Sequence, residues 1–515
     1  MLFRSADLYG DGVNIAARLE ALAEPGSIFV SASVYDQVKH KLSSGFDDLG
    51  PQVVKNIVEL IHVYRVSEEV NKRPPNRQLI RKPRLGGSRF AAIAATVLIF
   101  GLTFAAYMFW PRIEHRSGPP VVAVLPFTNM SGDPGQDYLG PGVAEDIITM
   151  LSTSPLLRVV SKSSSFAFRD AQEIRLVARE LNVDYIVEGS IRRVGDSFRI
   201  STQLVQGADG QNLWSERLEQ EGSNVPALQE AVANKVYSTL AGLKGEIVKH
   251  EANMTWSKAG PGLEEYDYHL RGATELLKWT DASKAQARLI WIEGLGKFPD
   301  SVLLRLELAV FYNNAGVEGP SVDPWQDIQT AWRLIAETDR FPVRSRMEEW
   351  LYHYIKALVY PTAKGDFEAA VREAEAAHAL VPYDPLSSVD MSFVMANAGR
   401  VETAVEWAEY AVNNEAVVPD WYRDRLAWAY YNAGRAEEAV TQYEKISYYC
   451  GICKAAALVR AGRIADAKAL IAVIKTENPG LTLALAGLAP GDRFPFMAEK
   501  VLTPYLADLE AAGLQ

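Results

Sequence analysis

The sequence lacks the residues and motifs from which many enzymes build an active site. It has only two cysteines, and two thiols alone do not make a metal site. The seven histidines are scattered and show no metal-ligand spacing, at positions 40, 62, 115, 250, 269, 353 and 378. No Walker loop, His-Glu-x-x-His motif or nucleophile elbow is present. The sequence therefore carries none of the usual signatures of phosphate-loop enzymes, zinc hydrolases or serine hydrolases.

The chain also lacks a net positive charge. Its 53 Lys and Arg against 64 Asp and Glu give a net charge of −11, which argues against a general affinity for nucleic acid. A length of 515 residues predicts several domains. Residues 68–89 depart from the acidic average, because they are rich in proline and arginine, and we interpret them as a flexible basic linker.

A short motif near the start, from Tyr9 to Glu20, carries the strongest functional signal. Residues 13–22 favour a helix, and Asn14 and Arg18 lie four residues apart, so both side chains lie on one helical face. An amide beside a guanidinium suits a sugar hydroxyl and a phosphate oxygen. The alternative is an ordinary amphipathic helix whose core face is Ile15, Leu19 and Leu22.

The motif and the sequence after it, residues 6–67, resemble the end of a bacterial class III nucleotidyl cyclase catalytic domain. The following turn at Pro25-Gly26, a short strand, a helix after Ser31 and a strand over residues 58–66 fit that resemblance. The resemblance implies that Asn14 orients the ribose, Arg18 stabilises charge on the reacting phosphate and Lys55 contacts the triphosphate. Asp7 matches the position that reads the base, where aspartate selects adenine. Family enzymes are dimers with shared sites, so a homodimer is implied.

The resemblance also predicts what the chain is missing. The family holds two divalent metal ions, Mg or Mn, with two aspartates that precede this motif, and residues 1–6 supply neither. We therefore expect no cofactor in the chain as given, and a metal only if the upstream half is supplied. Residues 1–67 are accordingly expected to be a partial domain of a phosphorus-oxygen lyase, inactive alone, whose complete form converts ATP to cyclic AMP and pyrophosphate.

Residues 90–110 form an uncharged run of twenty-one residues, which is long enough to span a bilayer. Seven basic residues precede Phe90 within the linker, and two follow Trp110. The positive-inside rule then predicts a single-pass inner-membrane protein with a cytoplasmic N-terminus and with the residues after 111 in the periplasm. A buried core helix is the alternative.

Residues 119–245 alternate between strand and helix patterns. Strands are expected at 120–127, 156–161, 184–190 and 198–204 and around Trp214, with helices at 140–151, 171–181 and 225–243. The segments VAVLPFTNMSGDP, DYIVEGSIRR and LWSERLE are similar to the amino-terminal domain of TolB. This resemblance implies an α/β fold and a protein-binding module.

Residues 262–515 contain a repeat. Glycines occur at 365, 399, 434 and 462, and an alanine follows each of them by five residues, at 370, 404, 439 and 467. A period near 34 with a small residue where two helices meet is typical of tetratricopeptide repeats, which present a groove to a protein partner. The alternative is an array that only spaces or dimerises the protein. Cys450 and Cys453 fall within this array, and we interpret them as small core residues, with a disulfide as the alternative.

The predicted fold class is thus multidomain: an α+β cyclase fragment, a single transmembrane helix, a TolB-like α/β domain and an all-α repeat solenoid. Two functions remain open. The chain is either part of a membrane-bound adenylate cyclase or a non-catalytic, membrane-anchored TolB-like and repeat-containing scaffold. Sequence immediately upstream, carrying two aspartates on strands, would favour the cyclase.

Overall fold

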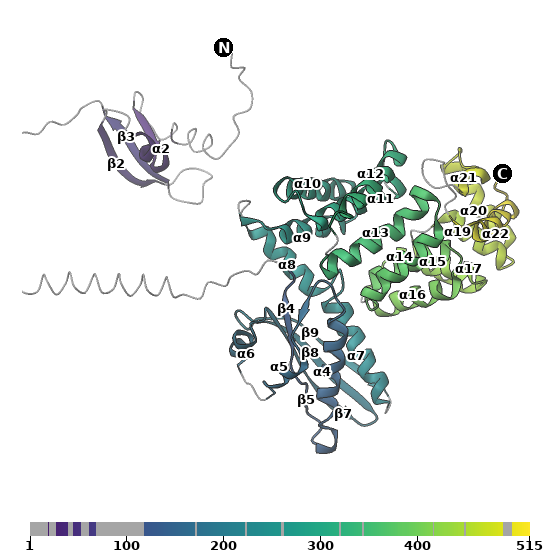
Figure 1. The fold of residues 1–515 in the computed structure, drawn as a ribbon, viewed down its shortest axis with the longest axis horizontal. Helices are drawn as coiled ribbons and strands as arrows, with labels where there is room; N and C mark the ends of the chain where they lie inside the picture. The colour runs from purple at the N-terminus through teal and green to yellow at the C-terminus, as the bar shows by residue number, and fades with distance from the viewer. Residues whose placement is uncertain are drawn as a thin grey trace, which may run out of the picture. The chain divides into compact units, whose positions relative to one another are not determined.

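The chain folds into two compact units, residues 1–111 and 112–515. The structure is a computed structural model (Figure 1). It describes residues 19, 27–39, 45–52, 61–67, 118–169, 173–221, 224–258, 262–318, 321–341, 344–415, 417–447, 450–487 and 497–515.

The first unit contains a three-stranded antiparallel sheet in the order β1 (Ile28–Ser31), β3 (Ile61–Ser67), β2 (Gly45–Gln52). Helix α2 (Ala32–Val38) follows β1 directly. The predicted strand and helix after residue 26 and the predicted strand near residue 61 are confirmed. Strand β2 was not predicted, because its glycine and proline content disfavours strands. The structure accommodates Gly50, at φ 73°, with a register shift between Asp48 and Gly50.

The second unit begins with a mixed sheet in the order β6-β4-β7-β8-β9, with β5 added beside β7. The strands are β4 (Val121–Val124), β5 (Thr128–Asn129), β6 (Arg158–Val159), β7 (Tyr185–Val194), β8 (Ser197–Gln206) and β9 (Asn212–Glu221). Strand β4 pairs in parallel with β6 and β7, and β7, β8 and β9 pair antiparallel. The predicted strands are confirmed, and the predicted turn at Gly195 joins β7 to β8 with φ 64°.

Helices cover both faces of this sheet. Alternation along β4 sends Val122 and Val124 to one face, where they join the core under α4 (Leu139–Leu151) and α7 (Val225–Leu240). Ala123 and Leu125 point to the other face, which α6 (Ile174–Leu181) covers. A short 3-10 turn η1 (Pro134–Gln136) and helix α5 (Lys162–Phe166) complete this part. The predicted helices here are confirmed, with ends within a few residues.

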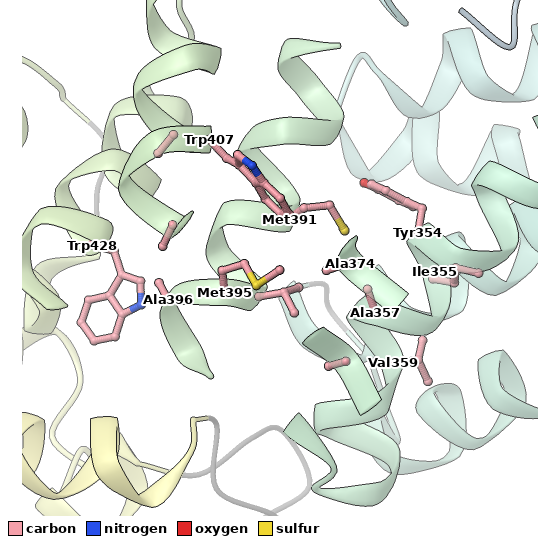
Figure 2. Packing of buried hydrophobic residues seen from close by; sticks show 14 of the residues in the cluster. Tyr354, Ile355, Ala357, Val359, Ala374, Met391, Met395, Ala396, Trp407 and Trp428 are labelled. Atoms are coloured by element: carbon pink, nitrogen blue, oxygen red, sulfur yellow. The ribbon is translucent and has the colours of Figure 1, made fainter. Parts of the chain in front are cut away.

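The rest of the second unit is helical. Consecutive helices pack against one another, and a continuous apolar core runs through them (Figures 1 and 2). The helices are α8 (Glu246–Ser257), α9 (Glu265–Leu276), α10 (Asp281–Lys297), α11 (Val302–Glu318), α12 (Pro324–Thr338), α13 (Arg346–Lys364), α14 (Phe367–Leu380), α15 (Pro385–Asn397), α16 (Val401–Asn414), α17 (Asp420–Asn432), α18 (Ala436–Tyr443), α19 (Gly451–Arg460), α20 (Ile464–Glu477), α21 (Leu483–Ala486) and α22 (Glu499–Ala511).

The repeated glycines and alanines have distinct structural roles. All four repeat glycines have a positive φ, between 67° and 76°, in the turn between two paired helices, where a residue with a β-carbon would be strained. The four repeat alanines are 0% exposed, because each lies where the second helix of a pair meets its neighbours. The predicted helical pairs are therefore confirmed at α13–α14, α15–α16, α17–α18 and α19–α20.

Close packing of α9 against α10 gives a direct test of this core. A β-carbon at Gly272 would lie 2.1 Å from Nε1 of the fully buried Trp291, whereas one at Gly296 would meet nothing within 4 Å. We expect Gly272→Ala to destabilise the fold by roughly 1–3 kcal/mol through overpacking. Gly296→Ala, the matched control in α10, should be neutral or stabilising by about 0.5 kcal/mol, because alanine favours a helix. Urea unfolding of both variants checks this, and equal losses would contradict the packing.

The predicted membrane-spanning fold class is corrected by the structure. Among the residues described, no helix is both long enough and apolar enough to cross a bilayer. The longest of these helices, α13 with 19 residues, carries five charges, on Arg346, Glu348, Glu349, Lys356 and Lys364. The segment predicted to span, residues 90–110, lies outside the described residues. The fold is therefore given as a mixed α/β N-terminal part followed by a helical region. The single-pass inner-membrane location, with residues after 111 in the periplasm, is not retained.

Candidate functional site

The four predicted nucleotide-contacting residues lie outside the described part of the chain. Asp7, Asn14 and Arg18 precede β1, and Lys55 lies between β2 and β3, so the structure neither brings them together nor separates them. Leu19, which directly follows Arg18, is helical and 4% exposed. This burial agrees with its predicted place on the apolar face of the motif helix.

The polar side chains on β2 and β3 pair with one another across the sheet. Asp48 accepts from the Gly50 backbone N–H at 2.8 Å and contacts His62 Nε2 at 2.6 Å. The Gly50 hydrogen bond, followed by that of His62, lowers the pKa of the Asp48 carboxyl. Next to them Arg65 Nη2 contacts Asp47 Oδ2 at 3.1 Å. Asp47 and Arg65 face each other directly in the β2–β3 register. These exposed side chains already have protein partners, so we assign them a structural role.

No metal-ligand cluster is found in the described ranges of either unit. No group of three or more histidine, cysteine, aspartate or glutamate side chains lies close enough together there to hold an ion. We assign no metal ligand among these described residues.

In the second unit, a buried carboxylate joins the α/β region to the helical region. Asp384 Oδ2 accepts from the Leu243 backbone N–H at 3.0 Å, just beyond α7, and Asp384 Oδ1 caps α15 by accepting from Ser387 N–H at 2.7 Å. Asp384 is 3% exposed, and Tyr237 and Tyr383 pack edge to face beside it with centroids 6.1 Å apart. Two segments 141 residues apart in the sequence thus share one side chain.

Burial controls the charges at this joint. Removal from water raises the pKa of Asp384 to about 6, although the Ser387 and Leu243 backbone N–H groups oppose that rise. Burial also lowers the pKa of the neighbouring Lys244, whose ammonium lies 5.4 Å from the centre of the Tyr422 ring. The sequence contains a signal for the cap, because Asp384 precedes Pro385 at the first helical position. No sequence pattern indicates the bond to Leu243.

The structure joins Cys450 and Cys453 in a disulfide, so our preferred interpretation of two free core thiols is wrong and the alternative holds. Cys450 is also the N-cap of α19, where its sulfur accepts from the Cys453 backbone N–H. The pair lies inside the helical array, as predicted, and near α22.

Two family descriptions match parts of the chain. Residues 3–66 match the adenylate and guanylate cyclase catalytic domain, and residues 119–235 match the second domain of HilA/YgeH-like transcriptional regulators. The predicted resemblance of the N-terminal segment to a cyclase is thus confirmed. The match to residues 119–235 covers the α/β region with its mixed sheet.

Individual proteins are also similar to parts of this chain. "Putative adenylate cyclase 3" of Rhizobium meliloti is 34% identical over 289 residues, covering 56% of this chain and 44% of that protein. The Tol-Pal system protein TolB of Hahella chejuensis is 26% identical over 193 residues, covering 35% and 43%. The chain therefore spans less than half the length of either relative. A solved tetratricopeptide-repeat protein of Thermus thermophilus is 20% identical, with coverage of 41% and 98% and a TM-score of 0.27.

Proposed function

We propose that this chain is part of an adenylate cyclase-type signalling protein that converts ATP to cyclic AMP and pyrophosphate. The observation that carries the proposal is the cyclase match over residues 3–66, which includes the Asn14 and Arg18 motif. The 34% identity to a putative adenylate cyclase supports the same direction. In this role Asn14 orients the ribose, Arg18 stabilises phosphate charge, Lys55 holds the triphosphate and Asp7 selects adenine. Two copies share the site as a homodimer.

The second unit has the regulatory role in this proposal. Residues 118–515 form one compact body in which Asp384 bonds to Leu243 and Arg346 Nη1 donates to the Ser152 carbonyl at 3.1 Å. A protein bound to the helices therefore acts on the α/β region through direct contacts rather than through a linker. The rival proposal is a non-catalytic protein-binding scaffold.

We expect these 515 residues alone to form no cyclic AMP from ATP and manganese, because the cyclase resemblance places the two metal-binding aspartates before the Asn14 motif and residues 1–6 contain no aspartate. Supplying the upstream half of a class III cyclase domain, fused before residue 1, should restore turnover. Asn14→Ala in that fusion is the negative control, because it removes the proposed ribose contact and leaves the metal ligands unchanged. Formation of cyclic AMP by the unfused chain would contradict the proposal that its catalytic site is incomplete. A folded, nucleotide-binding fusion without turnover would favour the scaffold.

A further inference from the structure

The last helix, α22, folds back over earlier helices of the array. Its Tyr505 is 1% exposed and lies 5.3 Å, centre to centre, from the Trp428 ring of α17 and 6.2 Å from the Tyr431 ring. Tyr505 Oη also lies 4.0 Å from Cys453 Sγ of α19. One aromatic side chain of α22 is thus inserted between two helical pairs.

A carboxylate three residues later makes the second anchor. Asp508 Oδ2 accepts from Arg460 Nε at 2.6 Å and from Tyr431 Oη at 2.5 Å. The Arg460 guanidinium lies 3.9 Å from the centre of the Tyr431 ring, so it is held in place by stacking. The α17–α19 surface therefore presents an aromatic pocket beside a fixed positive charge, and α22 supplies the matching ring and carboxylate on one helical face.

Helix α22 also reaches the preceding pair. The Ala498 backbone N–H donates to the Asn397 carbonyl at the end of α15, at 2.8 Å. Lys500 lies directly over Gly399, where an added β-carbon would stand 2.3 Å from Lys500 Cε. We call the surface made by Asn397, Gly399, Trp428, Tyr431 and Arg460 the α22 seat.

The helix that fills the seat is intrinsically weak. It is 13 residues long and has Pro504 in its interior, which removes one backbone hydrogen bond and costs roughly 3 kcal/mol in a helix. Its first turn borders a groove of about 720 Å³, on the other side of which lie Asp366 and Phe367 at the start of α14. The helix depends on docking for its stability, and one flank of it is open to solvent.

We propose that the α22 seat recognises a helix of a partner protein that carries an aromatic residue and, three positions later, a carboxylate, with α22 as the built-in competitor. Charge complementarity supports this partner, because the Arg460 guanidinium requires an anion and the stacked rings require an aromatic neighbour. The inference rests on the protein-binding role of the helical region given above. It does not depend on cyclic AMP synthesis.

The test uses the full chain and a fluorescent peptide of residues 497–515 as the partner-like probe. Asp508→Arg places two guanidinium groups together and should release α22. The peptide should then bind this variant about tenfold or more tightly than it binds the unchanged chain, because the seat is open in a larger fraction of molecules. Asp466→Arg is the matched control. It breaks the exposed ion pair between Arg463 Nε and Asp466 Oδ2, which is 2.8 Å long and lies outside the α22 seat. The Asp466→Arg variant should bind the peptide as weakly as the unchanged chain does.

Hydrogen exchange of residues 499–511 reports release independently. Leu509→Ala, which removes a fully buried apolar contact and alters no charge, is a second release variant if Asp508→Arg folds poorly. A peptide with Tyr505→Ala and Asp508→Ala should not bind. The proposal is overturned if α22 stays protected in both variants, or if it opens and the peptide still fails to bind. Because no nucleotide is present, either result leaves the cyclase proposal to its own assay.

Discussion

Replacing Arg18 with alanine is expected to lower the turnover number by roughly 10²-fold in an active cyclase that contains residues 1–67. Negative charge grows on the phosphate oxygens as pyrophosphate leaves, and a fixed guanidinium stabilises that charge mainly in the transition state. Substrate affinity should change much less, because the ground state gains little from the same contact. The measurement is steady-state kinetics on a fusion that supplies the upstream half of the domain.

Two neighbouring substitutions give contrasting results in the same fusion. Lys55→Ala should mainly raise KM, because contacts to the triphosphate form in the ground state as well. Asp7→Ala should weaken the discrimination between ATP and GTP, because this side chain is proposed to read the base. If Arg18→Ala instead raised KM and left turnover unchanged, its assigned role would be wrong. The motif would then be better explained as an ordinary amphipathic helix with Leu19 on its core face.

Local sequence patterns predicted much of the second unit. Strand β8 alternates apolar and polar residues from Phe198 to Leu204, and this pattern survives folding because one face of the strand is buried. The repeat glycines and alanines predicted helical pairs because each has one steric reason to be there, a positive φ or a close helix contact. Predictions of this kind depend on neighbours within a few residues.

Contacts between distant segments could not be predicted in the same way. The Asp384 bond to Leu243 joins residues 141 apart, and the Asp508 bond to Tyr431 joins residues 77 apart. Nothing in the local pattern of either segment indicates its partner. The covering of the α17–α19 surface by α22 could not be predicted either, because α22 resembles one more amphipathic helical segment in the sequence. The proposed nucleotide contacts stay predictions, since all four residues lie outside the described ranges.

The stability of the joint at Asp384 should depend on pH through the ionisation of this one carboxyl. Its pKa is about 6 in the folded chain and near 3.8 when unfolded, so the folded state binds the proton more tightly. Its contribution to stability is therefore fully present below about pH 4 and is lost as the pH rises through 6. The loss amounts to about 3 kcal/mol for a shift of this size, with Glu415 adding to it and Lys244 opposing it.

Asp384→Asn tests this linkage, because asparagine still caps α15 but cannot ionise. Hydrogen exchange at the Leu243 and Ser387 amides, corrected for intrinsic rates, reports the free energy of opening the joint. In the native chain this free energy should fall between pH 4 and pH 6 and stay constant above pH 6. The variant should lack that fall while losing part of the Leu243 bond at every pH, since an amide has one acceptor oxygen.

Asp366→Asn, at the exposed N-cap of α14, is the matched control and should keep the native profile. Parallel profiles for Asp384→Asn and the native chain would show that the carboxyl does not govern the joint. The connection between the α/β region and the helices would then depend on apolar contacts such as the packing of Tyr237 against Tyr383.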